Sequence, residues 1–285
     1  MNVGDLFWLF LIFGALQPAI SQKLLEAARQ RLIAALEAKR QSRVILLVHR
    51  QETMSWFGFP VMRYIDLEDS EEIIRAIHLT GPSIPLDLVL HTPGGLALAA
   101  AQIARAIRSR KSPVTVFVPH YAMSGGTLIA LAADQIVMCE HSVLGPVDPQ
   151  LGEWPAASVL KVLERKPASE IEDRTWILAD QASKAISQVK ELVREILHSH
   201  YPEDTVKEIA DRLTEGYWTH DYPITYQKAK ELGLRVSNEM PNEVLQLMAL
   251  YPQPVRRHSG VEYLPFPYEK PAGRSAHSPG SIETA

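Results

Sequence analysis

Four short apolar runs recur between residues 43 and 139. They are Arg43–His49, Leu86–Leu90, Val114–Val118 and Gln135–Cys139. A continuous apolar run of this length, bounded by polar or turn residues, is typical of a strand buried on both faces. We therefore expect four buried strands in this part of the chain.

Helical periodicity occupies the segments between these runs. Asp69–Glu72 begins a helix with the character of a capping box, which we expect to run to about His78. Leu96–Arg108 is an alanine-rich helix, and a third helix follows Ser124. Strands and helices that alternate over such short connections predict an α/β fold with a mainly parallel sheet and helices on both faces.

Later segments predict more helices and then a tail. Three stretches have helical patterns: Glu172–Leu197, Asp204–Leu213 and Tyr226–Leu232. From Tyr251 the chain is rich in proline, serine, glycine and charge, so residues 251–285 are expected to be a disordered tail. Residues 43–250 would then form the main domain.

The N-terminus has an apolar run of a different kind. Leu6–Gln22 holds 17 uncharged residues, at the short limit of a membrane span. A cleaved signal peptide is an alternative, with a weak site at Ala19–Ser21, but the first five residues carry no lysine or arginine. A buried core helix would need a large partner surface. We therefore predict an uncleaved N-terminal membrane anchor over residues 1–22.

The charge that flanks this run predicts its orientation. Basic residues follow the run and none precedes it: Lys23, Arg29, Arg31, Lys39, Arg40 and Arg43. The positive-inside rule then places the main domain in the cytoplasm, with a single-pass anchor. Residues 23–42 have an amphipathic helical pattern and are expected to form a stalk.

Composition and charge exclude several kinds of binding site. The 285 residues carry a net charge of −4, so nothing suggests nucleic-acid binding. The single cysteine, Cys139, excludes an internal disulfide and a cysteine zinc site, and it reads as a buried small hydrophobe. His91–Gly95 is glycine-rich but lacks the lysine of a phosphate-binding loop, so no cofactor is expected.

A serine lies between the third strand and the next helix. Ser124 is followed by Gly125 and Gly126, and such a residue can occupy a sharp turn with its hydroxyl exposed. A glycine-rich turn with a solvated serine is the alternative. His91–Gly95 also follows a strand directly, and the carboxyl ends of parallel strands meet at one edge, so the two glycine motifs should lie close together.

A nucleophilic serine needs a base and donors for the oxyanion. The N–H groups of Gly125 and Gly95 are the candidate donors, because a glycine lets the backbone approach a ligand closely.

Three motifs in this order carry a family resemblance: Thr92–Gly95, Ala122–Thr127 and Val143–Gln150. They resemble the Clp-fold serine peptidases, above all the membrane-anchored signal peptide peptidase A-like and serine dehydrogenase proteinase families. The resemblance implies a Clp/crotonase-like spiral of ββα units. It also implies Ser124 as nucleophile, an oxyanion hole at Gly95 and Gly125, and a homo-oligomer.

The motifs do not decide which residue is the general base. Signal peptide peptidase A uses a Ser-Lys dyad, whereas soluble Clp peptidases use Ser-His-Asp, and Asp148 stands where the Clp histidine is expected. Lys166 lies 42 residues after Ser124, ahead of a long helix, and is the predicted base. Weaker candidates are Lys161, Lys184 and His141.

Other polar residues have structural interpretations that are at least as good. His91 and His120 flank the glycine motifs and could hold loop backbone. His220–Asp221 resembles an acid–base pair but also a helix-entry turn, and Asp148 is more readily structural.

The predicted protein is a membrane-anchored serine endopeptidase that cleaves membrane-proximal or hydrophobic segments of protein or peptide substrates. The alternatives are a catalytically inactive scaffold of the same fold and a crotonase-type acyl-CoA enzyme.

Overall fold

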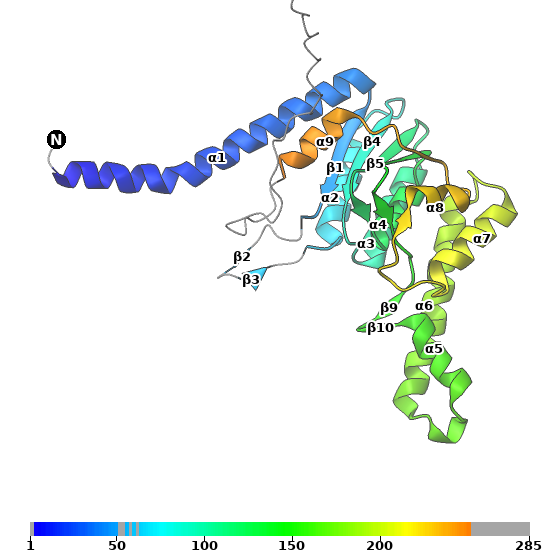
Figure 1. Cartoon of the computed structure of the whole chain (residues 1–285). Helices are drawn as coiled ribbons and strands as arrows, with labels where there is room; N and C mark the ends of the chain where they lie inside the picture. Colours follow the sequence, from blue (N-terminus) through cyan, green and yellow to red (C-terminus); the bar gives the residue numbers. More distant parts are fainter. Residues whose placement is uncertain (1–2, 51–54, 57–58, 61–62, 252–285) are drawn as a thin grey trace, which may run out of the picture. The chain divides into compact units, whose positions relative to one another are not determined.

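A five-stranded parallel sheet forms the centre of the structure (Figure 1). The computed structural model describes residues 3–50, 55–56, 59–60 and 63–251. Neighbouring strands of the sheet follow one another along the chain, in the order β1 (Arg43–Val48), β4 (Leu86–His91), β5 (Val114–Val118), β7 (Gln135–Met138) and β12 (Val236–Ser237). The four predicted strands and their parallel arrangement are confirmed, and β12 is an addition.

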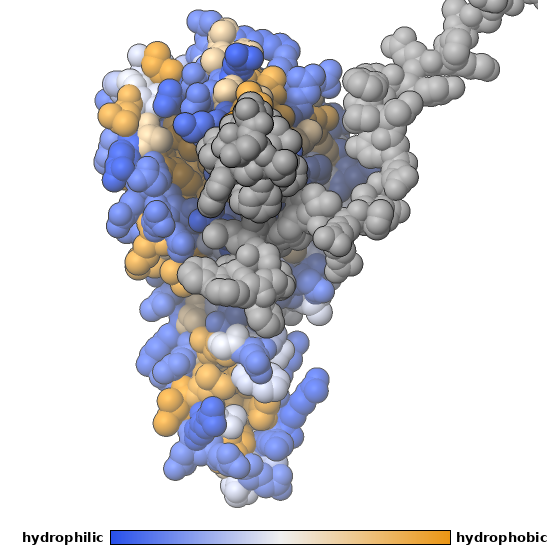
Figure 2. Space-filling view, turned by 90° about the vertical axis from the view of Figure 1, so that its left-hand side faces the viewer, coloured by the Kyte–Doolittle hydropathy of each residue, from blue (hydrophilic) through white to orange (hydrophobic). Residues whose placement is uncertain are grey.

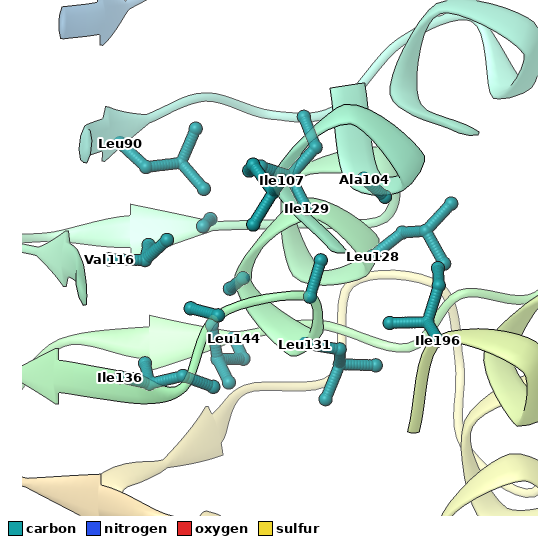
Figure 3. Packing of buried hydrophobic residues seen from close by; sticks show 14 of the residues in the cluster. Leu90, Ala104, Ile107, Val116, Leu128, Ile129, Leu131, Ile136, Leu144 and Ile196 are labelled. Atoms are coloured by element: carbon teal, nitrogen blue, oxygen red, sulfur yellow. The ribbon is translucent and has the colours of Figure 1, made fainter. Parts of the chain in front are cut away.

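Side chains of the strands alternate between two apolar layers. One layer lies under three helices, α2 (Leu67–His78), α3 (Ala97–Arg108) and α4 (Gly125–Leu131). Figure 3 shows Leu90, Val116 and Ile136 of the sheet facing side chains of these helices. Helices therefore cover this face as predicted.

The opposite face is covered by the end of α1 (Val3–Arg40) and by α9 (Asn242–Ala249). Leu36 of α1 is fully buried in this second layer. Arg40 forms an ion pair of 2.5 Å with Asp87 of β4, whose other carboxylate contact is the Ser42 hydroxyl at 2.6 Å. The end of the predicted stalk is thus part of the folded domain.

The predicted anchor and stalk belong to one continuous helix, α1. Within the part of the chain that the structure describes, no helix is both long and apolar enough to cross a bilayer. The side chains of residues 1–16, 18 and 19, which make up most of the predicted anchor, lie outside that description. The predicted tail, apart from Tyr251, also lies outside the described residues.

Most predicted helices agree with the structure to within two residues. They are α3, α6 (Asp173–Leu197), α7 (Glu203–Thr214) and α8 (Tyr226–Glu231). The start of α2 is a correction: the helix begins at Leu67 because Asp66 is its N-cap, and Asp66 and Asp69 form a reciprocal capping box. The helices α5 (Ala156–Arg165) and α9 and the 3-10 turn η1 (Ala168–Glu170) are additional.

Very short strands complete the fold. β6 (Tyr121–Ala122) pairs in parallel with β8 (Val143–Leu144), which pairs antiparallel with β11 (Ile224–Thr225). Two further pairs are antiparallel: β9 (Gln150–Leu151) with β10 (Trp154–Pro155), and β2 (Ser55–Trp56) with β3 (Phe59–Pro60). The β6–β8–β11 sheet draws together three segments that are far apart in the sequence.

Candidate active site

Ser124 occupies a sharp turn between β6 and α4. It is the N-cap residue of α4 and has φ 50° and ψ −116°, a backbone conformation that non-glycine residues rarely adopt. Backbone strain of this kind costs about 1–3 kcal/mol and gathers at functional sites. The predicted strand–turn–helix setting of the serine is therefore confirmed.

The two glycine motifs meet beside this turn. The Met123 N–H donates to the Thr92 carbonyl (3.0 Å), and the Thr92 N–H donates to the Tyr121 carbonyl (3.2 Å). These bonds join the loop after β4 to the segment that carries Ser124. The approach expected from the parallel sheet is thus observed.

Two backbone N–H groups are available next to Ser124. Among the described residues, no hydrogen bond uses the N–H of Gly95 or of Gly125. The two groups are close, because a Cβ built on Gly125 would lie 3.6 Å from the Gly95 nitrogen. At Gly95 a Cβ would lie 2.2 Å from the Ile65 carbonyl oxygen, so a side chain does not fit there. The arrangement suits an oxyanion hole.

A histidine–carboxylate pair faces the same region. Nδ1 of His220 lies 2.8 Å from Oδ1 of Asp148, and the Gln150 side-chain amide donates to Oδ2 of Asp148 at 2.7 Å. Asp148 is 4% exposed. Its hydrogen bond raises the pKa of His220 despite the opposing effect of burial. Because Nδ1 is held by the carboxylate, Nε2 of His220 remains to accept a proton.

The β6–β8–β11 sheet explains this convergence. β8 leads into Asp148, the segment before β11 carries His220, and β6 leads into Ser124. Thr127 adds a further tie, because its hydroxyl donates to the Ala122 carbonyl (2.8 Å) and accepts from the Gly145 N–H (3.0 Å).

The serine, the two glycines and the histidine–carboxylate pair line one cavity of about 500 Å³. Its lining includes Ser124, Gly95, Gly125, Asp148 and His220. Among the described residues, no hydrogen bond joins the Ser124 hydroxyl to His220. Catalytic hydrogen bonds are often long without substrate and tighten in the reactive complex.

The predicted lysine base lies elsewhere in this structure. Lys166 is the exposed C-cap residue of α5 and is not among the residues that line the Ser124 cavity. Lys161, Lys184 and His141 are also exposed and do not line it. Ser124, Gly95 and Gly125 are therefore brought together, whereas Lys166 is not.

The two histidines that flank the glycine motifs have structural settings. His91 is 2% exposed, and its ring packs against those of Tyr121 and His120. Burial, together with the nearby charges of Arg50 and the other histidines, lowers the pKa of His91 to about 3. A histidine with so low a pKa binds a proton only weakly, and because it also lies outside the cavity lining it is not suited to activate Ser124.

Cys139 is half-buried rather than fully buried, and burial raises the pKa of its thiol. It does not line the Ser124 cavity. Within the described part of the chain, no group of three histidine, cysteine or acidic side chains could hold a metal ion.

Comparisons with known proteins identify the family of the chain. A model of the ClpP-like SDH-type serine proteinases matches residues 1–277. An uncharacterised protein of Methanocaldococcus jannaschii is similar to this chain, with 52% identity over 268 residues, 94% of each chain.

Two solved structures are similar at lower identity. A variant of the 1510-N membrane-bound stomatin-specific protease, in complex with a substrate peptide, is 24% identical; the match covers 64% of this chain and 74% of that chain, with a TM-score of 0.43. A variant of ClpP1 from Listeria monocytogenes is 16% identical, and the match covers 73% of this chain and 99% of that chain, with a TM-score of 0.46.

The family model spans nearly the whole chain, and it agrees with the resemblance carried by the three sequence motifs. The chain belongs to the ClpP-like SDH-type serine proteinases.

Proposed function

We propose that this protein is a membrane-anchored serine endopeptidase that works through an acyl-enzyme. The observation that carries the proposal is the cavity in which a strained serine, two available backbone N–H groups and a histidine–carboxylate pair meet. A scaffold would not need this combination, because a positive φ at Ser124 is costly to maintain.

In the proposed reaction, Ser124 Oγ attacks the carbonyl carbon of the scissile peptide bond. The hydroxyl proton passes to the general base, and the N–H groups of Gly95 and Gly125 bind the oxyanion. The C–N bond then breaks as the base returns the proton to the leaving amine. Water hydrolyses the resulting ester by the same steps and releases Ser124.

We propose His220, held by Asp148, as that base. It lines the cavity with Ser124, and its Nδ1 is held by a carboxylate, as a general base requires. Lys166, predicted from the resemblance, remains the competing candidate. Its exposed position would have to change before it could reach Ser124 and lose enough solvation to act as a base.

The surroundings of the cavity favour apolar substrates. At Leu151 it adjoins a second cavity of about 980 Å³, lined by apolar side chains of α5 and α6 such as Val159, Val162 and Leu178. Figure 2 shows hydrophobic side chains on the surface of the α5–α6 region, at the bottom of the view. Trp154 and Ile177 in this region are more than half exposed. Hydrophobic substrate segments could bury apolar side chains against this surface.

The membrane anchor and the homo-oligomer are further parts of the proposal. The anchor is proposed from the 17 uncharged residues of Leu6–Gln22 and the basic residues that follow. Retention of the full chain in membranes after alkaline carbonate washing, and its release by detergent, would test the anchor. Light scattering of the detergent-solubilised protein would test the oligomer.

Labelling by a fluorophosphonate probe tests the reaction. The wild type should label, and Ser124→Ala should not. His220→Ala should lower the labelling rate by about 10³-fold or more, since loss of a triad member has effects of this size. His198→Ala, at an exposed histidine beyond α6, is the matched control.

Two results would overturn parts of the proposal. If Lys166→Ala abolishes labelling while His220→Ala retains it, the lysine is the base. If the folded wild-type protein neither labels nor cleaves an apolar internally quenched peptide, the scaffold alternative replaces the peptidase.

A further inference from the structure

A second set of polar side chains contacts the loop Thr92–Gly95, here called the oxyanion loop because it carries the proposed donor Gly95. Nε2 of His49, just after β1, is 3.2 Å from Oδ2 of Asp69 in α2. Nδ1 of His49 is 2.9 Å from the hydroxyl of Thr92, just after β4. His49 is 3% exposed and Thr92 is 0% exposed. Three separate elements are thus joined by a chain of hydrogen bonds in which the histidine and the threonine are buried and Asp69 is partly exposed.

The ionisation of Asp69 and the protonation of the imidazole limit which atom donates in each hydrogen bond. Burial alone would raise the pKa of Asp69, but its hydrogen bonds with His49 and the Asp66 backbone and the nearby charges of His49 and Arg63 lower it. An ionised carboxylate can only accept, so Nε2 of His49 carries a hydrogen. In a neutral imidazole Nδ1 then accepts from the Thr92 hydroxyl, whereas in a charged imidazolium Nδ1 donates to the Thr92 oxygen, whose own hydrogen can point to the Gly94 carbonyl 3.4 Å away.

Either direction leaves a lone pair of the Thr92 oxygen free to accept. The Gly94 N–H donates to that oxygen at 3.2 Å, and the Gly94 carbonyl accepts from the Ile65 N–H at 2.7 Å. Gly94 has φ 104°, and a Cβ on it would lie 2.8 Å from Cβ of Ser124. Gly94 is therefore fixed from both sides, directly before Gly95 and against the nucleophile.

Thr92, His49 and Asp69 have the composition of a hydroxyl–imidazole–carboxylate triad. Thr92 is nevertheless fully buried and does not line the cavity of Ser124. Its methyl group packs where a Cβ on Gly126 would otherwise fit, 2.6 Å away. A second nucleophile is thus excluded, and the contacts of its hydroxyl point to the loop.

We propose that Thr92 and His49 are positioning residues that hold Gly94 so that the N–H of Gly95 is directed at the oxyanion. Asp69 orients His49, and His49 acts through the Thr92 hydroxyl. This inference rests on the proposed peptidase function. A displaced donor weakens stabilisation of the transition state while leaving the apolar substrate contacts intact, so kcat should fall and KM should change little.

The test compares two substitutions at one position. Thr92→Val keeps the shape and the methyl group but removes the hydroxyl, whereas Thr92→Ser keeps the hydroxyl. With an apolar internally quenched peptide, Thr92→Val should lower kcat by about 10–100-fold, the effect of a displacement of about 1 Å. Thr92→Ser should recover most of this loss. Thr80→Val is the matched control, because that hydroxyl bonds to the Ala76 carbonyl at the end of α2.

A second measurement does not depend on activity. Hydrogen exchange of the Gly94 amide should accelerate in Thr92→Val, and it should stay slow in Thr92→Ser and Thr80→Val. His49→Leu should also lower kcat, and adding it to Thr92→Val should lower kcat little further, because the two groups act as one unit.

Unchanged exchange at Gly94 in Thr92→Val would overturn the inference, whatever the activity of the protein. A fall in kcat that Thr92→Ser does not recover, or that Thr80→Val matches, would assign Thr92 a purely structural role. Absence of wild-type labelling would instead refute the peptidase, and the exchange result would still decide whether Thr92 holds the loop.

Discussion

The backbone of Ser124 is expected to cost this protein folding stability. At φ 50° and ψ −116° the Cβ atom is unfavourable by about 1–3 kcal/mol. Ser124→Gly removes that strain, and the greater freedom of glycine in the unfolded chain takes back about 0.4–1 kcal/mol. Ser124→Ala keeps the Cβ and therefore the strain. Its lost hydroxyl caps no helix N–H, because Ser124 makes no side-chain cap bond.

We therefore expect Ser124→Gly to be about 1–2 kcal/mol more stable than Ser124→Ala, although both are inactive. For a domain of this size that difference corresponds to about 2–8 °C in Tm. Urea unfolding of the detergent-solubilised proteins, followed by tryptophan fluorescence, measures it. Ser183 in the middle of α6 is the control, since Ser183→Gly should be less stable than Ser183→Ala in an ordinary helix. If Ser124→Ala proves as stable as Ser124→Gly, the turn is not strained and the reasoning fails.

Two other substitutions test the site and the core. The hydrogen bond to Asp148 raises the pKa of His220, which must be neutral to accept a proton. Asp148→Asn should therefore lower kcat/KM and move the rising limb of its pH profile to lower pH. A limb that does not move would contradict His220 as the base. Arg40→Met leaves the buried carboxylate of Asp87 with only the hydrogen bond from the Ser42 hydroxyl among its described contacts, and it should lower the free energy of unfolding in urea by about 3–5 kcal/mol. Adding Asp87→Leu should recover part of this loss. A loss below about 1 kcal/mol would refute the view that the buried carboxylate depends on Arg40.

The sheet and the turn that carries Ser124 could be predicted from local pattern. A buried parallel strand is apolar along its whole length, and this is why β4 and β5 were predicted at nearly their observed ends. Ser124 was predicted because strand, serine and glycines are adjacent in the sequence. The position of Gly95 close to Ser124 was predicted from topology, since the carboxyl ends of parallel strands lie at one edge of the sheet.

The pairing of His220 with Asp148, the proposed base, could not be predicted in the same way. Asp148 and His220 are 2.8 Å apart in space, yet the strands that bring them together, β8 and β11, have two residues each and no readable periodicity. Each residue alone also had a good structural interpretation. A histidine in an aromatic loop and an aspartate between prolines were the available signals, and neither names its partner.

Sequence alone determined the strand–helix alternation and the sharp turn at Ser124, because these depend on neighbours within a few residues. Tertiary structure decided which titratable groups share the cavity, and it set Thr92 and His49 behind the oxyanion loop. The physical reason is distance along the chain: the short strands pair, and the loops bond to one another, through contacts between residues about 20 to 80 positions apart, which local propensity does not encode.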